Sequence, residues 1–284
     1  MDADGFDLTS AHIAIVGLGL MGGSLAMALK GKCAELYGVS PTPATLETAL
    51  RLGIVSQAAA GPAAILPRAD VIVLAAPLPA ILDLLAQLPE LVPQPCIVLD
   101  LGSSKEEILS AMATLPERFD PIGGHPICGK ERLSLANAEA GLYQDAPFVL
   151  TPLERTTTQA RSCAQKIVAA VGARPVWLDA AAHDAGIAAT SHLPYLVASA
   201  LALATPCVPE ALLGPGFRST SRLAATPSAM MLGVLQSNRT NLLAALARFR
   251  SRLDSLEAAL IDEDADKLQS LLDQAAFRRS ELVP

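Results

Sequence analysis

A histidine set among glycines is the residue of this 284-residue chain best suited to move a proton. The letters around His125 read Gly-Gly-His-Pro-Ile-Cys-Gly. Glycines let the backbone approach a ligand closely, and Pro126 stiffens the position after the ring. We therefore interpret His125, on a glycine-rich loop at a strand end, as a base that accepts a hydroxyl proton as a hydride leaves. His12, His183 and His192 do not have metal-ligand spacing to it, so we expect no metal site.

A hydride needs an acceptor, and a glycine-rich segment near the N-terminus predicts one. An apolar, β-branched run leads into G-x-G-x-x-G and then into a helical pattern. Gly17 permits a tight turn, Gly19 lets the backbone approach a pyrophosphate, and Gly22 lets helix and strand pack closely. The helix opens at Leu20 and Met21, where free N–H groups face the anion. We predict a site for a nicotinamide or flavin dinucleotide.

The end of the second predicted strand bears on which dinucleotide is bound. An NAD site usually has Asp or Glu there, to bind the ribose hydroxyl. This chain has Ser40, followed by Pro41 and Thr42. With two hydroxyl groups and no carboxylate to repel a phosphate, the sequence predicts that NADP is accepted and preferred, with NAD as the alternative.

Two further groups of polar residues have both structural and functional interpretations. Ser103 with Glu106 is a capping-box pattern, but a hydroxyl at that helix start can also bind substrate. Arg218 and Arg222 are four residues apart and would share a helical face, either at a solvated surface or as a bidentate site for a carboxylate. Asp184 near a helix start is most simply a dipole partner of that helix, with its neighbour His183 at the surface.

Hydrophobic periodicity places these residues on a fold. Short apolar runs alternate with helical patterns, which predicts a mostly parallel, doubly wound Rossmann-type α/β sheet with helices on both faces. The chemistry then belongs at the carboxyl ends of the strands. The runs predict strands at 34–39, 71–75, 96–99, 148–150 and 175–178, and helices at 46–52, 81–88, 105–115 and 159–171.

Strand signals stop after Leu178, and the rest of the chain reads as helical. We predict a dinucleotide-binding domain at 1–179 and an all-α domain at 180–284 for substrate binding and dimerisation. Segment 185–209 has no charged residue but is interrupted by prolines, so we expect a buried helix and not a membrane span. A second copy of the chain would cover it, which predicts a homodimer.

Composition limits the class of protein. A hydrophobic content of 51% supports a large core, and a net charge of −7 offers no basic surface for nucleic acid or an anionic membrane. The five cysteines form no C-x-x-C pair, which favours reduced thiols in the cytoplasm. The N-terminus shows no signal-peptide pattern.

Several of these motifs, taken together and in order, resemble the prephenate/arogenate dehydrogenase family of tyrosine biosynthesis. The combination of HPxxG, SHLP and GFRxxxR is specific to that family, whereas GxGxxG is shared by many dehydrogenases. The matching segments are GLGLMGGS at 17–24, DLGSSK at 100–105, GHPICGKE at 124–131, FVLTP at 148–152, His183-Asp184, SHLP at 191–194, GFRSTSR at 216–222, and Asn238.

The resemblance implies an oxidative decarboxylation in which hydride passes to the nicotinamide, carbon dioxide leaves and the ring aromatises. It implies that Ser103 and His125 contact the ring hydroxyl, that Arg222 holds the ring carboxylate and that His192 lines the pocket near the nicotinamide. It also implies an intertwined helical dimer. Many prephenate-using members have histidine where this chain has Tyr195, so we expect arogenate to be used at least as well as prephenate.

Two other interpretations are kept as alternatives. A β-hydroxyacid-type dehydrogenase shares GLGxMG, but its helical-domain pattern of lysine followed a turn later by asparagine is not found here. A non-catalytic dinucleotide-sensing protein would keep the glycines without needing Ser103, His125 and Arg222 together.

Overall fold

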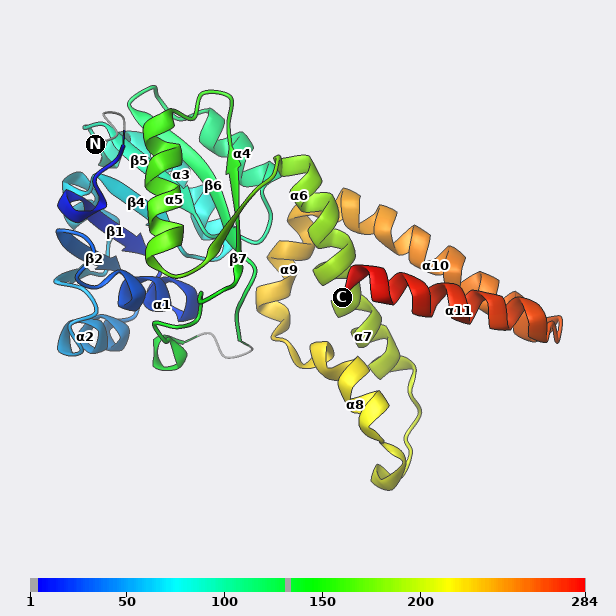
Figure 1. The fold of residues 1–284 in the computed structure, drawn as a ribbon. Coiled ribbons are helices and arrows are strands. Elements are labelled where there is room, and N and C mark those ends of the chain that lie inside the picture. The colour runs from blue at the N-terminus through cyan, green and yellow to red at the C-terminus, as the bar shows by residue number, and fades with distance from the viewer. Residues whose placement is uncertain (1–4, 131–133, 284) are drawn as a thin grey trace.

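The computed structural model describes residues 5–130 and 134–283, and within them an eight-stranded sheet forms the first half of the chain (Figure 1). The strand order is β3-β2-β1-β4-β5-β6-β7-β8, and every neighbouring pair is parallel except β6 with β7. The predicted doubly wound, mostly parallel fold is confirmed. The strands are β1 His12–Val16, β2 Glu35–Val39, β3 Gln57–Ala59, β4 Val71–Leu74, β5 Cys96–Asp100, β6 Phe119–Pro126, β7 Pro147–Pro152 and β8 Arg174–Trp177.

Helices cover both faces of the sheet because the central strands are apolar on both sides. Every residue of β4 and β5 is buried, as expected for parallel strands between two helical layers. One core packs α1 and α5 against the sheet, and the other packs α3 and α4 against its opposite face. The helices are α1 Leu20–Leu29, α2 Pro43–Arg51, α3 Leu78–Leu91, α4 Glu106–Ala113 and α5 Thr158–Ala170, with 3₁₀ turns η1 Leu8–Ser10, η2 Pro62–Ala64, η3 Leu66–Arg68 and η4 Leu135–Asn137.

Two strands are absent from the prediction, and both have compositions that disfavour strands. Strand β3 is a short edge segment with the sequence Gln-Ala-Ala, and β6 contains two prolines and two glycines. The omission of β6 matters because His125 lies inside this strand, paired with Val149 of β7. The prediction that His125 lies on a glycine-rich loop is therefore wrong: its backbone belongs to a strand that pairs with β7.

The described residues from Ala180 onward form helices only. Helix α6 (Ala180–Ile187), a π-helical turn η5 (Ala188–His192) and α7 (Leu193–Ala204) run on continuously. A π turn here widens the helix just before Pro194, which has no N–H to donate. Helices α10 and α11 form an antiparallel hairpin that projects away from the sheet (Figure 1). The remaining elements are η6 Glu210–Leu212, α8 Pro215–Ser221, η7 Arg222–Ala225, α9 Ser228–Ser237, α10 Arg239–Ile261 and α11 Ala265–Leu282.

The helical half exposes more apolar surface than the sheet half. The helix Ala180–Ala204 is long and apolar enough, by length and composition alone, to cross a membrane, yet only 17% of its apolar window is buried within one chain. The burial expected for this segment is therefore not reached inside a single copy. Leu203 is 88% exposed and Phe277 66% exposed.

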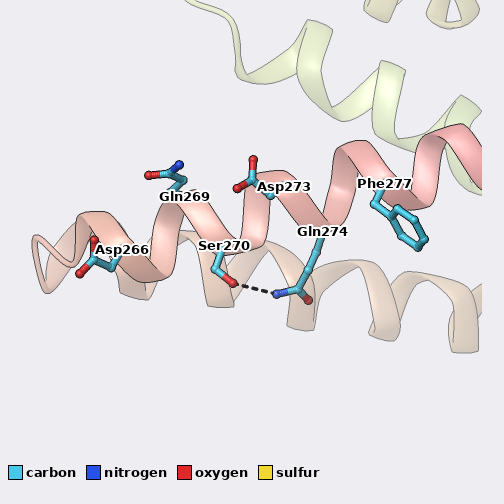
Figure 2. Close-up of a pocket in the computed structure, with 6 residues that line it drawn as sticks. All are labelled: Asp266, Gln269, Ser270, Asp273, Gln274 and Phe277. Carbon is cyan, nitrogen blue, oxygen red and sulfur yellow. Dashed lines mark hydrogen bonds between the residues drawn. The ribbon is translucent and has the colours of Figure 1, made fainter.

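A shallow hollow follows the exposed side of α11 (Figure 2). A hydrogen bond of 3.2 Å from Gln274 Nε2 to Ser270 Oγ crosses one turn of the helix beside it. The hollow lies on the projecting hairpin and contains none of the predicted site residues. Its lining is Asp266, Gln269, Ser270, Asp273, Gln274 and Phe277.

Candidate functional site

The loop between β1 and α1 has the geometry of a phosphate cradle. Gly17 has a φ of +100°, and a Cβ there would lie 2.4 Å from the carbonyl oxygen of Ala75. A Cβ on Gly22 would lie 1.9 Å from the carbonyl oxygen of Gly17. No other residue fits either position, so strand, loop and helix approach one another more closely than side chains would allow. Helix α1 then begins directly after Gly19, with its first N–H groups at the loop.

Two hydroxyl groups follow the neighbouring strand. Strand β2 pairs with β1 in parallel, with Val39 opposite Val16, so Ser40 comes next to the start of the glycine loop. Ser40 is buried, and its Oγ accepts a hydrogen bond of 3.4 Å from the N–H of Thr42. Thr42 precedes α2 and is exposed. A cradle that a Cβ would fill, beside a strand end without a carboxylate, fits a nicotinamide dinucleotide and its ribose.

His125 is joined to the helical half of the chain. Its Nδ1 lies 2.8 Å from Nε2 of His183, and Nδ1 of His183 lies 2.6 Å from Oδ1 of Asp184. Burial lowers the pKa of His125 well below its usual value, and the neighbouring basic groups Lys105, His183 and His192 disfavour its protonation further. His125 is therefore neutral at neutral pH, as a proton acceptor must be.

The structure corrects the expectations for His183 and Asp184. His183 is 1% exposed and is not a surface residue. Asp184 does not serve the start of its own helix, because Asp179 caps α6 through the N–H of Ala182 at 2.8 Å. Asp184 is directed across to the sheet half instead.

Asp184 caps α4, a helix from the other half of the chain. Its Oδ1 accepts the N–H of Lys105 at 2.7 Å, and its Oδ2 accepts the N–H of Glu106 at 2.9 Å. Burial opposes ionisation of Asp184, but hydrogen bonds from His183 and from these two backbone groups outweigh it, and its pKa lies below the usual value. The capping box expected at Ser103 is wrong: α4 begins at Glu106, and its cap comes from Asp184.

A buried ion pair fixes the backbone beside His125. The ammonium of Lys105 donates to the Asp100 carboxylate and, at 2.7 Å, to the carbonyl of Gly124. Asp100 also accepts the N–H groups of Gly102 at 2.7 Å and Gly124 at 3.1 Å. Complete burial raises the pKa of Asp100 and lowers that of Lys105. The sequence pattern did not predict this pair, although Asp100 directly follows an apolar run.

The two serines before α4 differ in their surroundings. Ser103 is partly exposed, and its hydroxyl makes no hydrogen bond within the described part of the chain. Ser104 is buried and pairs with Ser237 of α9 at 2.8 Å. Ser104 therefore ties the two halves together.

Within the residues that the structure describes, Nε2 of His192 is buried and has no hydrogen-bond partner. Asn238 Nδ2 donates to the carbonyl of Asp184 at 2.7 Å and lies 3.3 Å from Nδ1 of His192. Because the amide donates there, Nδ1 of His192 is the acceptor and its proton is on Nε2, which is buried with no partner. Burial holds the pKa of His192 at about 4. An unpaired buried donor suits a ligand acceptor.

The remaining predicted residues lie on helices away from the sheet. Tyr195 is partly buried on α7, and Arg222 is the exposed first residue of η7, which packs against α7. Arg218 is exposed. Its Nε donates a hydrogen bond of 2.9 Å to the carbonyl of Leu213, and its Nη2 lies 3.6 Å from the carboxylate of Glu210. The surface interpretation therefore holds for Arg218.

Comparison with known proteins gives a consistent match over both halves. The family model "Prephenate dehydrogenase, nucleotide-binding domain" matches residues 25–177, and "Prephenate dehydrogenase, dimerization domain" matches residues 179–274. Prephenate dehydrogenase of Bacillus subtilis is 29% identical over 269 residues, which are 90% of this chain and 72% of that protein.

Solved structures agree. Prephenate dehydrogenase from Aquifex aeolicus, in complex with hydroxyphenyl propionate and NAD⁺, superposes with a TM-score of 0.89 at 27% identity, covering 97% of this chain and 99% of that one. Arogenate dehydrogenase from Synechocystis gives a TM-score of 0.84 at 32% identity, covering 96% of this chain and all of that one (100%).

Proposed function

The chain belongs to the prephenate dehydrogenase family, and from this membership we propose that it catalyses the NAD(P)-dependent oxidative decarboxylation of prephenate, arogenate or both, in tyrosine biosynthesis. The observation that carries the proposal is the position of His125, a neutral histidine at the carboxyl end of the sheet, hydrogen-bonded to the helical half. A dinucleotide-sensing protein has no need of such a base, and a β-hydroxyacid dehydrogenase belongs to a different family.

In the proposed reaction, His125 accepts the proton of the ring hydroxyl. The bound dinucleotide supplies the chemistry of hydride acceptance. The ring carboxylate leaves as carbon dioxide, and its bonding electrons aromatise the ring. We assign the second contact to the ring hydroxyl to Ser103, which is partly exposed and follows the carboxyl end of β5.

Three residues of the helical half are proposed to bind substrate. The guanidinium of Arg222 would hold the ring carboxylate through bidentate hydrogen bonds. The unpaired Nε2–H of His192 would donate to a ligand acceptor near the nicotinamide. Tyr195 would line the pocket at the substrate side chain, where a neutral phenol tolerates the ammonium group of arogenate.

For the cofactor, we propose that Gly17, Gly19 and Gly22 cradle the pyrophosphate against the first turn of α1, at Leu20 and Met21. Ser40 and Thr42 would receive the ribose and its phosphate, since the strand end carries hydroxyls and no carboxylate. NADP is therefore preferred over NAD.

We further propose a homodimer in the cytoplasm, with the chain divided near Asp179 into a dinucleotide-binding and a helical domain. The exposed apolar side chains of the helical half support the dimer, because a second copy would cover them. The five free cysteines support a reducing compartment.

A spectrophotometric assay with each substrate and each dinucleotide tests these proposals. We expect reduced nicotinamide to form with prephenate or arogenate, and kcat/KM to be higher with NADP than with NAD. Absence of turnover with both substrates would overturn the function, and a clear preference for NAD would overturn only the cofactor proposal.

A further inference from the structure

An unbroken chain of hydrogen bonds runs from the sheet to the helical half through two histidines. It links Nδ1 of His125 to Nε2 of His183 at 2.8 Å, and Nδ1 of His183 to Oδ1 of Asp184 at 2.6 Å. His183 and Asp184 are buried, so the bond between them is shielded from water, while the bond from His183 to His125 is partly buried. The proposed reaction uses only the first member of this chain.

Asp184, the last member of this series of hydrogen bonds, determines which ring nitrogen of each histidine carries the proton. Asp184 is ionised and accepts backbone N–H groups on both of its oxygens, so it is an acceptor toward His183. The proton of His183 is then on Nδ1, which leaves Nε2 as an acceptor. His125 must therefore carry its proton on Nδ1, and its Nε2 is left with a free lone pair.

We infer that His183 and Asp184 are positioning residues that orient His125 and hold it in the tautomer whose Nε2 is the base. This inference rests on the proposed function and deepens it. The tautomer matters because the other form would present N–H toward the substrate hydroxyl and could not accept its proton.

The reaction requires only a temporary store for that proton. With a bound dinucleotide to supply hydride acceptance, the O–H proton of the substrate would pass to Nε2 of His125 as the C–H bond breaks. The bond to the ring carboxylate then breaks, carbon dioxide leaves, and its electron pair returns through the ring to the oxygen, which takes the proton back as a phenol. No net proton is released, so a buried site is sufficient.

The charges around His125 show why its protonated form needs a stabilising partner. The ammonium of Lys105, although it is paired with Asp100, disfavours the imidazolium form of His125. The neighbouring ring of His192 disfavours that form as well. The carboxylate of Asp184, acting through His183, opposes this effect while the proton is on the ring.

The tautomers can be measured directly. We expect ¹⁵N NMR of the full-length protein with labelled histidine to show Nδ1–H and bare Nε2 for His125 and His183, but Nε2–H for His192. The chain has four histidines, so single His→Gln variants assign each signal. An Nε2–H signal for His125 would overturn the inference, and this measurement stands even if a variant of His183 fails to fold.

Kinetics give the second readout. We expect His183→Phe to lower kcat by about 10- to 10³-fold, with KM and dinucleotide affinity changed by less than about 3-fold. His183→Gln should recover about 10-fold of the loss, because its amide oxygen can still accept the Nδ1–H of His125. His12→Phe is the control: His12 makes a similar bond to Asp70, at 2.9 Å, but at the opposite, amino end of β1.

The outcomes separate the two proposals. A wild-type enzyme that oxidises neither substrate would end the proposed function whatever the tautomers are. An active wild type with a near-normal kcat in His183→Phe, or equal losses in the Phe and Gln variants, would remove His183 from the mechanism and leave the function intact.

Discussion

Asp184 Oδ1 lies 2.7 Å from the backbone nitrogen of Lys105, a residue 79 positions earlier in the chain. This bond joins the helical half to the start of α4, where the sheet half carries its buried ion pair. The same carboxylate oxygen accepts His183, so one group both caps a helix and orients the histidine that reaches His125. The stability of the junction and the position of the base are therefore coupled.

Removing this cap should destabilise the fold. We expect Asp184→Ala to lower the free energy of unfolding by about 2–4 kcal/mol, since it leaves the buried N–H of Lys105, the partly buried N–H of Glu106 and the ring of His183 without their acceptor. Asp179→Ala, which removes the exposed cap of α6, should cost only about 1 kcal/mol. Urea unfolding of both variants measures this difference, and equal losses would contradict it. Ser103→Ala should change stability by less than about 0.5 kcal/mol.

Replacing the proposed base should affect turnover and leave cofactor binding intact. We expect His125→Asn to lower kcat by about 10²- to 10⁴-fold, because no group remains to accept the hydroxyl proton. Dinucleotide affinity, measured by fluorescence titration, should change little. A near-normal kcat would remove His125 from the mechanism.

Arg222 should act on substrate binding. We expect Arg222→Ala to reduce kcat/KM by the equivalent of about 2–5 kcal/mol, because a carboxylate would lose its bidentate partner. Arg218→Ala is the matched control, since Arg218 is exposed and bonded to Leu213 and Glu210. Steady-state kinetics of both variants give the comparison. An unchanged kcat/KM in Arg222→Ala would mean that this arginine is only a surface residue.

Tyr195 should influence the choice between the two substrates. We expect wild-type kcat/KM for arogenate to equal or exceed that for prephenate. Tyr195→His should shift the ratio toward prephenate by about 1–3 kcal/mol, since a cationic ring repels the ammonium of arogenate. Measuring both substrates with both proteins tests this. A strong wild-type preference for prephenate, or an unchanged ratio, would place the selection elsewhere.

Stability should fall as the pH drops from about 6.5 to about 4. Burial holds the pKa of His192 at about 4, below its ordinary 6.5. In this window the unfolded chain protonates His192 and also His125, whose pKa burial likewise lowers, while the native chain does not, so each of these two groups costs about 1 kcal/mol per pH unit. The pKa of Asp184 is lowered from 3.8, so its contribution is lost only at lower pH. Urea unfolding across the window should show this slope, and His192→Gln should reduce it. The same slope in that variant would contradict the assignment.

The sequence by itself determined the architecture of the first half. Apolar runs alternating with helical patterns specify buried parallel strands between helices, because each strand must bury both of its faces. The glycine spacing at Gly17 and Gly22 likewise specifies a turn that no side chain fits. Such local signals survive in a single sequence because the residues involved are neighbours in the chain.

Only the tertiary structure decided how the site is assembled. Strand β6 has a poor strand composition and forms because β5 and β7 pair with it on both sides. Asp184 looks like a dipole partner of its own helix, but packing of the two halves brings α4 within its reach and Asp179 already caps α6. Hydrogen bonds between distant segments depend on that packing, which no local pattern encodes, and so the chain from His125 through His183 to Asp184 exists only in the folded protein.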